Sequence, residues 1–211
     1  RKVLDRSHIM PIETATTEIT TENTTETTTE TSTESTTETT TEDTTEAAND
    51  TLVVYFSASR GKNTKGIAES ISDILKADIY EIIPEVPYTD EDLDYGDSSS
   101  RTTIEMNDPN SRPTISGSVE NMDKYSVIFV GYPIWWGEAP RILSTFMESY
   151  NFSGKTIVPF CTSGSSGIGS SATNLQKLTN EANWLSGHRF SSSESRENIE
   201  NWIDGLEINK K

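Results

Sequence analysis

Hydrophobic residues along this chain gather in short β-branched runs, which alternate with segments of helical spacing. The strongest runs lie at residues 51–56 (TLVVYF), 125–131 (YSVIFVG) and 155–161 (KTIVPFC). Runs of this kind predict strands that are buried on both faces of a sheet. Weaker runs at 78–83 and 184–190 predict two more strands, which makes five in all.

Apolar residues three and four positions apart predict helices between these strands. The expected helices cover about residues 64–76, 139–150, 170–178 and 199–206. The segment 84–121 contains four prolines and is expected to be mostly loop around one helix near 101–107. Regular alternation of strand and helix requires a parallel sheet covered on both faces. The fold class is therefore α/β, with five parallel strands in the doubly wound order 2-1-3-4-5.

A long polar tail precedes this domain. Residues 13–46 contain nineteen Thr and nine Glu, and a Glu recurs every four residues from Glu18 to Glu46. Like charges at this spacing repel on a helix, Thr is a poor helix former, and almost nothing apolar is available to pack. We expect residues 1–50 to be a disordered linker and 51–211 to be the domain. Residues 1–10 differ in composition, are typical of a cloning remnant and are set aside.

The tail also bears on where the protein acts. A Thr-rich stalk is typical of extracytoplasmic proteins, where it spaces a domain from the cell surface and carries O-linked sugars. We therefore expect an extracytoplasmic or surface-tethered protein. An inert spacer is the simpler interpretation of the tail, and because no signal peptide is visible, a cytoplasmic location stays open.

Charge and cysteine content exclude several classes of function. The net charge is −17, of which residues 1–50 contribute −9, and this acidity disfavours nucleic acid while it favours docking to a basic redox partner. The single Cys161 allows neither an internal disulfide nor a thiolate metal cluster, and His8 and His188 alone cannot form a zinc site. Cys161 and His188 are best interpreted as structural. No apolar run is long enough for a membrane span, and we expect a monomer.

Unusual residues follow three of the strands, at the edge where ligands bind in doubly wound sheets. The first loop, residues 57–64 (SASRGKNT), combines hydroxyl groups with the amides of a helix N-terminus, which suit a phosphate monoester. Gly61 is expected to allow a turn there. The loop matches neither the Walker pattern nor the dinucleotide glycine pattern. An ordinary capped turn is the simpler interpretation of this loop taken alone.

The second loop, residues 131–141 (GYPIWWGEAPR), carries adjacent tryptophans between Pro133 and Gly137. Exposing both indoles would be unfavourable unless a ligand covers them, and a flat flavin ring is a suitable partner. The alternative is that one of the two lies in the core. The third loop, residues 162–169 (TSGSSGIG), has three glycines that let its backbone approach a planar ligand.

With these loops the chain resembles the flavodoxin family, and in particular bacterial flavodoxin-like proteins with GYPIWWG followed by A-P-R and a later PFCTSG-x-SGIG run. The resemblance covers about residues 51–205 and implies a flavodoxin-like fold with non-covalently bound FMN. The first loop departs from it, because the usual six-residue T/S-x-T-G-x-T loop is eight residues here. The expected FMN-binding residues are Ser57, Ser59, Gly61, Asn63, Thr64, Pro133, Ile134, Trp135, Trp136, Gly137, Thr162, Ser163, Gly164 and Gly169.

The resemblance further implies electron transfer through FMN, with redox proteins as partners and no catalytic residue of the chain itself. Two alternatives stay open. An FMN-dependent NAD(P)H:quinone-type reductase would use the same fold and site. A surface-tethered binding module that has lost FMN would explain the altered first loop. The stretch from Tyr88 to Tyr95 is expected near the open edge of the site.

Overall fold

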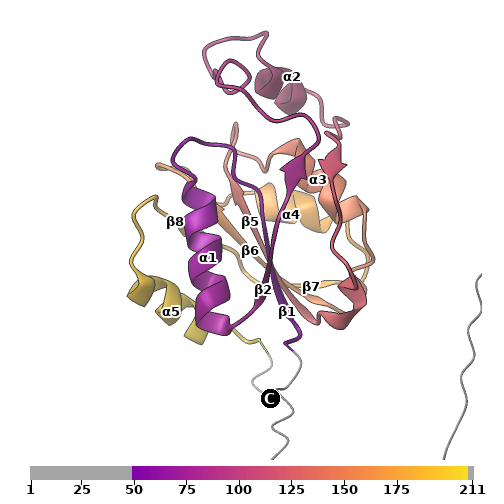
Figure 1. The fold of residues 1–211 in the computed structure, drawn as a ribbon, viewed down its shortest axis with the longest axis vertical. Coiled ribbons are helices and arrows are strands. Elements are labelled where there is room, and N and C mark those ends of the chain that lie inside the picture. Colours follow the sequence, from indigo (N-terminus) through magenta and orange to yellow (C-terminus); the bar gives the residue numbers. More distant parts are fainter. Residues whose placement is uncertain (1–48, 209–211) are drawn as a thin grey trace, which may run out of the picture. The chain divides into compact units, whose positions relative to one another are not determined.

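The computed structural model describes residues 49–208. The expected linker at residues 1–50 therefore lies outside the described part of the chain, apart from its last two residues. Within residues 49–208 the chain forms one central sheet with helices on both faces (Figure 1).

All strands of the central sheet pair in parallel. They run in the order β2-β1-β5-β6-β7, and β8 also pairs with β6. Their bounds are β1 Thr51–Tyr55, β2 Asp78–Glu81, β5 Val127–Pro133, β6 Thr156–Thr162, β7 Asn183–Trp184 and β8 His188–Phe190. The predicted flavodoxin-like order 2-1-3-4-5 is confirmed, with β7 and β8 together in the fifth position.

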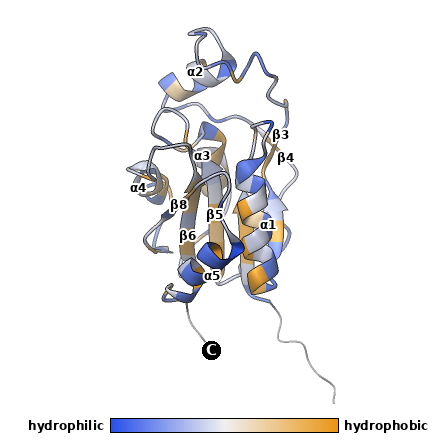
Figure 2. Ribbon diagram, turned by 90° about the vertical axis from the view of Figure 1, so that its left-hand side faces the viewer, coloured by the Kyte–Doolittle hydropathy of each residue, from blue (hydrophilic) through white to orange (hydrophobic). Residues whose placement is uncertain are grey.

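Helices cover both faces of this sheet, as Figure 2 shows from the side. α1 and α5 pack on one face, and α3 and α4 pack on the other. Their bounds are α1 Asn63–Leu75, α3 Arg141–Glu148, α4 Ser171–Gln176 and α5 Arg196–Asp204. Successive residues of a strand point to opposite faces, so Val53 faces α1 while Val54 faces α3. Each face thus has its own apolar core.

The fifth position of the sheet is split because β6 contains Pro159. β6 pairs with β7 at residues 156–157 and with β8 at residues 160–162, and it skips the residues between. Ile157 O accepts from Leu185 N on this side of β6, so the nitrogen of Pro159, two residues on, faces the same side. Proline has no N–H to donate, and pairing is interrupted there. The single strand predicted at 184–190 is therefore two short strands.

The segment 84–121 contains the predicted helix, which is α2 at Arg101–Asn107. Ser100 caps this helix, because its hydroxyl accepts from Thr103 N. The segment also forms a small antiparallel sheet of β3 (Ile83–Pro84) and β4 (Ile115–Ser116), which the pattern did not predict because two-residue strands have no periodicity. A 3-10 turn, η1 at Met122–Lys124, leads back to the central sheet.

Candidate functional site

The three loops leave the central sheet at one edge. β1, β5 and β6 are in register, with Tyr55 opposite Gly131 and Pro133 opposite Thr162 at their carboxyl ends. The hydroxyl oxygens of Thr64 and Thr162 are 2.7 Å apart and buried, which ties the first loop to the third. Ile134 N donates to Thr162 O at 3.1 Å and ties the second loop to the third. The fold thus brings the three predicted segments together.

The first loop has donors without acceptors. The hydroxyl oxygen of Ser57 is buried and has no hydrogen-bond partner among the described residues. The backbone amides of Asn63, Thr64 and Lys65 begin α1, and within residues 49–208 they have no acceptor either. No side chain caps this helix. Unpaired amides at a helix N-terminus, together with the helix dipole, favour an anion at this position.

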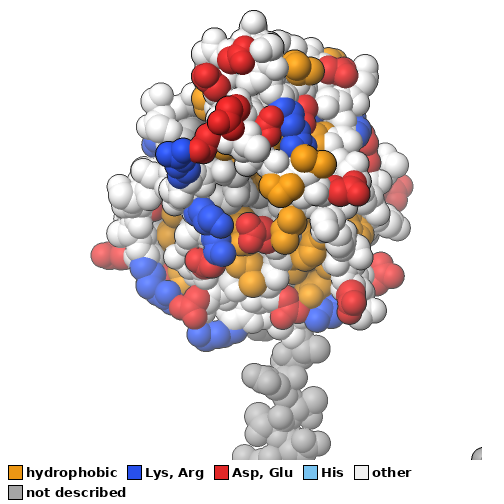
Figure 3. All heavy atoms as spheres, turned by 45° about the horizontal axis from the view of Figure 1, so that its top comes forward, with side chains coloured by type: hydrophobic (Ala, Val, Ile, Leu, Met, Phe, Trp, Pro, Cys, Tyr) orange, Lys and Arg blue, Asp and Glu red, His pale blue; other side chains and the backbone are white. Residues whose placement is uncertain are grey.

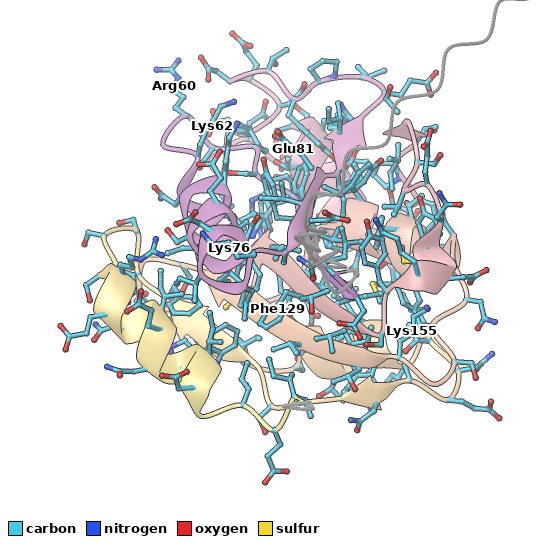
Figure 4. The ribbon with its side chains drawn as sticks, turned by 60° about the horizontal axis from the view of Figure 1, so that its bottom comes forward. Arg60, Lys62, Lys76, Glu81, Phe129 and Lys155 are labelled. Atoms are coloured by element: carbon cyan, nitrogen blue, oxygen red, sulfur yellow. The ribbon has the colours of Figure 1, made fainter. Side chains whose placement is uncertain are left out.

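The residue with a left-handed backbone conformation in the first loop is Lys62 rather than Gly61. Lys62 is the N-cap of α1 and has the left-handed conformation, with φ 45°. Gly61 lies within the turn, as expected, but its φ is not positive. A hydrogen bond from Lys62 N to Ser59 O, at 3.0 Å, closes this turn. Figure 4 shows Arg60 and Lys62 above the start of α1.

The second loop is a tight two-residue turn. Trp135 N donates to Glu138 O, and Glu138 N donates to Trp135 O, both at 2.9 Å. Trp136 and Gly137 between them have φ 49° and φ 78°. Positive φ at both central positions defines a type I′ turn, in which Asn or Asp usually precedes Gly. A tryptophan at the first position is strained, and the turn lifts its side chain out of the core.

The adjacent tryptophans have different environments. Trp135 is buried, 4% exposed, and packs edge-on against Phe56 and Tyr88 in the core. Trp136 is 42% exposed, and its ring centroid lies 4.6 Å from that of Tyr95, which belongs to the 84–121 segment. The alternative of one core tryptophan therefore fits Trp135. Trp136 is the indole that a planar ligand can reach.

The third loop is held from behind by Arg189 of β8. The guanidinium donates to Ser163 O and Gly164 O, both at 2.6 Å, and to Ser163 Oγ at 3.2 Å. The loop ends at Gly169, which has φ 52°. Gly164 and Gly169 are exposed, while Thr162 is buried. The loop therefore exposes its backbone at these glycines while hydrogen bonds from Arg189 anchor it.

Glu138 joins the second loop to α4. Its carboxylate accepts from Asn174 Nδ2 at 2.9 and 3.0 Å and from Ser170 Oγ at 3.0 Å. Three residues later, Arg141 donates to Met106 O at 2.8 Å and so fastens the end of α2 to the start of α3. These two charged residues of the GEAPR run thus hold the site's walls in place.

The structure places all fourteen predicted binding residues on the three loops at this edge. Ser59, Gly61, Trp136, Gly137, Gly164 and Gly169 are exposed; Ser57, Asn63, Pro133, Ile134 and Ser163 are half-buried; Thr64, Trp135 and Thr162 are buried. Their contact with FMN stays a prediction. Sequence reasoning did not assign roles to Glu138 or Arg189, and it placed Tyr95 only within the stretch expected near the open edge. Glu138 lies within the second-loop run, which was its only signal, and Arg189 had none.

The rim of the site is acidic and also partly apolar. Arg60 of the first loop pairs with Asp90 of the 84–121 segment, with Arg60 Nε donating to Asp90 Oδ1 at 2.9 Å. Glu91, Asp94 and Asp97 follow and are exposed. Figure 3 shows carboxylates gathered on this end, above apolar side chains. The expectation that 88–95 lies near the site's open edge agrees with the Arg60–Asp90 pair and the Tyr95–Trp136 contact.

A pocket of about 240 Å³ adjoins the first loop. Phe56, Ser57, Lys62, Glu81 and Tyr88 are among its lining residues. Burial raises the pKa of the Tyr88 hydroxyl, which donates to Glu105 at 2.6 Å. Tyr88 is therefore a neutral hydrogen-bond donor at neutral pH, and among the described residues that line the pocket the charged ones are Lys62 and Glu81.

Two features of residues 49–208 bear on other functions. Nowhere in that range do three or more His, Cys, Asp or Glu side chains group as metal ligands. In the same residues, no helix combines the length and apolar character that crossing a membrane requires. Cys161 is fully buried, and burial raises the pKa of its thiol to about 12, so the thiol stays protonated at neutral pH.

Comparison with known proteins agrees with this fold. The family model for flavodoxin matches residues 50–206. A solved structure from Bacteroides eggerthii DSM 20697, assigned as a flavoprotein, is 44% identical, and the alignment covers 76% of this chain and 99% of that one with a TM-score of 0.71. A second, from Bacteroides uniformis ATCC 8492 and assigned in the same way, is 41% identical over 74% of this chain and 98% of that one, with a TM-score of 0.70.

A flavoprotein from Lactobacillus acidophilus NCFM, solved in complex with FMN, shares the fold at 20% identity. The alignment covers 74% of this chain and 99% of that one, with a TM-score of 0.54. No curated protein matches the chain. The family match spans the whole described domain, including the three loops that meet at the sheet edge. The chain therefore belongs to the flavodoxin family.

Proposed function

We propose that this protein binds FMN at the three loops and transfers electrons through it. FMN as the cofactor is supported by the family and by the FMN complex of the Lactobacillus flavoprotein. When bound, FMN supplies the electron-carrying chemistry, and the protein sets its position and potential. The chain's own contribution is therefore to bind, orient and shield.

The observation that carries the proposal is the buried, unpartnered hydroxyl of Ser57 beside the free amides that begin α1. A buried donor without a partner costs about 1–3 kcal/mol unless a ligand satisfies it. A phosphate monoester supplies the acceptors that these groups lack. The residues present thus fit the phosphate end of FMN, with Ser57, Asn63 and Thr64 as its donors.

The ring end of FMN has a fitting surface as well. Trp136 offers an exposed indole on a rigid turn, and Gly164 offers exposed backbone across the site. Aromatic stacking favours a flat partner of this kind by about 0.5–1.5 kcal/mol beyond the area buried. We expect the ring to lie between Pro133–Gly137 and Thr162–Gly169.

An absorbance spectrum followed by reductive titration tests the proposal. The purified protein, or the apoprotein after FMN is added, is expected to show a flavin band, and its last one-electron potential is expected below that of free FMN. The acidic surface is the reason, because it disfavours an added negative charge. A protein that takes up no flavin would support the binding-module alternative. A potential no lower than that of free FMN would remove the electrostatic argument.

A steady-state assay separates electron transfer from the reductase alternative. We expect the holoprotein to pass electrons to a one-electron acceptor protein but not to turn over NAD(P)H with a quinone. The carboxylate of Glu138 in the second loop accepts hydrogen bonds from Asn174 and Ser170, and this structural role supports the carrier function over acid–base catalysis. Rapid NAD(P)H oxidation with a quinone would contradict it.

The proposed location is extracytoplasmic, with the Thr/Glu tail as the spacer. Its support is the composition of residues 13–46 alone. Cell fractionation followed by protease treatment of intact cells tests it, since a surface-tethered domain is released while a cytoplasmic one is protected.

A further inference from the structure

Arg189 turns two neighbouring peptide groups of the third loop toward itself. It lies in β8 beside Cys161 of β6, and its side chain is half-buried. Its Nη2 donates to Ser163 O and to Gly164 O, both at 2.6 Å, and its Nε donates to Ser163 Oγ at 3.2 Å. One guanidinium thus fixes the direction of two successive carbonyl groups.

The direction of these carbonyls determines the direction of the next two amides. In a trans peptide the N–H points opposite to the C=O, and the described residues contain no cis peptide bond. The N–H groups of Gly164 and Ser165 therefore point away from Arg189. Neither has an acceptor within residues 49–208. A Cβ built on Gly164 would meet nothing within 4 Å, so a ligand can approach this backbone.

The positive charge of Arg189 is not neutralised by a nearby carboxylate. None of the ion pairs within residues 49–208 includes Arg189. The guanidinium contacts the backbone of the third loop directly, through Ser163 O and Gly164 O. A cation with no paired carboxylate therefore lies beside the loop that the inference concerns.

We propose that Arg189 is a positioning residue that presents the amides of Gly164 and Ser165 to the pyrimidine edge of FMN and stabilises its reduced form. The carbonyl oxygens of that edge are acceptors, and reduction places negative charge there. Fixed amide dipoles and a nearby cation favour that charge. This inference rests on the proposed FMN site and adds a residue outside its three loops.

The test compares Arg189→Gln and Arg189→Lys with the unmodified chain. Arg196→Gln is the matched control, because Arg196 lies on α5 in surface pairs with Asp73 and Glu200. FMN affinity is measured by flavin fluorescence, and the potential of each one-electron step by redox titration. Arg189→Gln is expected to weaken the binding of oxidised FMN by about tenfold, the effect of losing one charged hydrogen bond.

The potential separates positioning from a merely structural effect. Arg189→Gln is expected to weaken the binding of fully reduced FMN by about tenfold more than the binding of one-electron-reduced FMN. This difference lowers the last one-electron potential by about 59 mV. Arg189→Lys keeps the charge but not the two-carbonyl geometry, so we expect affinity to fall and the potential to fall by less than in Arg189→Gln. Unchanged potential in Arg189→Gln, or an equal change in Arg196→Gln, would overturn the inference.

A second measurement needs no variant. In amide NMR spectra of the unmodified chain, the signals of Gly164 and Ser165 are expected to shift strongly when FMN is added to the apoprotein. If FMN binds and these two amides do not shift, the inference fails while the proposed function stands. If the chain binds no FMN at all, both fail. Poor folding of Arg189→Gln would leave this measurement to decide.

Discussion

Gly131 of β5 is small because the ring of Phe160 fills the space beside it. A Cβ at Gly131 would lie 2.1 Å from a ring carbon of Phe160, which is fully buried. Such closeness requires the core or the strand to move, and overpacking of this kind costs about 1–3 kcal/mol. The position matters for function too, because Gly131 opens the second loop.

We therefore expect Gly131→Ala to lower the free energy of unfolding by about 3 kcal/mol, the upper end of that range. Chemical denaturation measures it. Gly66→Ala is the matched control: Gly66 is exposed in α1 with nothing within 4 Å of a new Cβ, so Ala should stabilise by about 0.5–1 kcal/mol. Equal effects of the two substitutions would contradict the packing argument.

Trp136 and Tyr95 form a single aromatic surface at the site. Because Tyr95 packs on the indole at 4.6 Å, we expect it to hold Trp136 in place for the flavin ring. Trp136→Ala should weaken FMN binding by about tenfold and Tyr95→Ala should weaken it by about threefold, as expected for losing an aromatic contact. Fluorescence titration measures both. Ile104 is also exposed in the 84–121 segment, and Ile104→Ala should leave FMN affinity unchanged. Tighter FMN binding by Tyr95→Ala would show instead that the aromatic pair obstructs the flavin ring.

His188 gives the folded state a pH dependence. Burial lowers its pKa below the ordinary 6.5, although Glu194 acts in the opposite sense. Because the folded state binds this proton less readily than the unfolded state, the stability that His188 contributes is present above pH 6.5 and is lost as pH falls through its folded-state pKa. Urea denaturation between pH 5 and pH 7 should show stability falling, with a shallower slope for His188→Gln. Identical slopes in the two proteins would refute His188 as the cause of the pH dependence.

At the scale of elements, α2 is fastened to α3 by Arg141. Its guanidinium donates to Met106 O at 2.8 Å and approaches Glu105 O at 3.4 Å, at the carboxyl end of α2. A charged donor strengthens these hydrogen bonds, and the negative end of the α2 dipole also favours a cation at this position. Arg141 of the second loop therefore attaches the end of α2 to α3, in addition to other contacts of the 84–121 segment such as Arg112 with Glu148.

Arg141→Met should release this attachment and speed hydrogen exchange in α2 without unfolding the central sheet. The expected change is about tenfold for the amides of residues 101–107, corresponding to a loss of about 1.5 kcal/mol. Arg112→Met is a suitable comparison, because Arg112 pairs instead with Glu148 on α3. Exchange in α2 that rises no more for Arg141→Met than for Arg112→Met would contradict the assignment.

Elements also show what pattern reasoning can detect. The helices and the three long strands were predicted within a few residues because each buries an apolar face long enough to have a period. β7 and β8 could not be told apart, because their separation depends on the missing N–H of Pro159 in another strand. β3 and β4 have two residues each and depend on pairing with one another.

At the scale of the whole molecule, the net charge of −17 should control encounters with redox partners. Electron transfer from the reduced protein to a basic cytochrome c, used as a probe, should slow as salt is raised from 0.01 to about 0.5 M, because salt screens the attraction. Stopped-flow absorbance measures the rate.

The acidic rim of the site should account for part of that dependence. Replacing Glu91 and Asp94 by Gln and Asn should flatten the salt dependence, whereas replacing Glu197 and Glu207 by Gln should have a smaller effect. The first pair lies on the 84–121 segment that contacts the first and second loops, and the second pair lies on or after α5. Equal effects would show that net charge alone, and not its placement, steers the partner.

The sequence by itself determined the α/β class, the strand order and the three loops of the site, because buried strands, amphipathic helices and loop motifs are local patterns. Only the tertiary structure decided which tryptophan is exposed, that Lys62 rather than Gly61 adopts the left-handed turn, and that Arg189 and Glu138 hold the loops. Those features depend on contacts between residues far apart in the chain. Arg189 acts on a loop 25 residues away, and no spacing within the sequence records that contact.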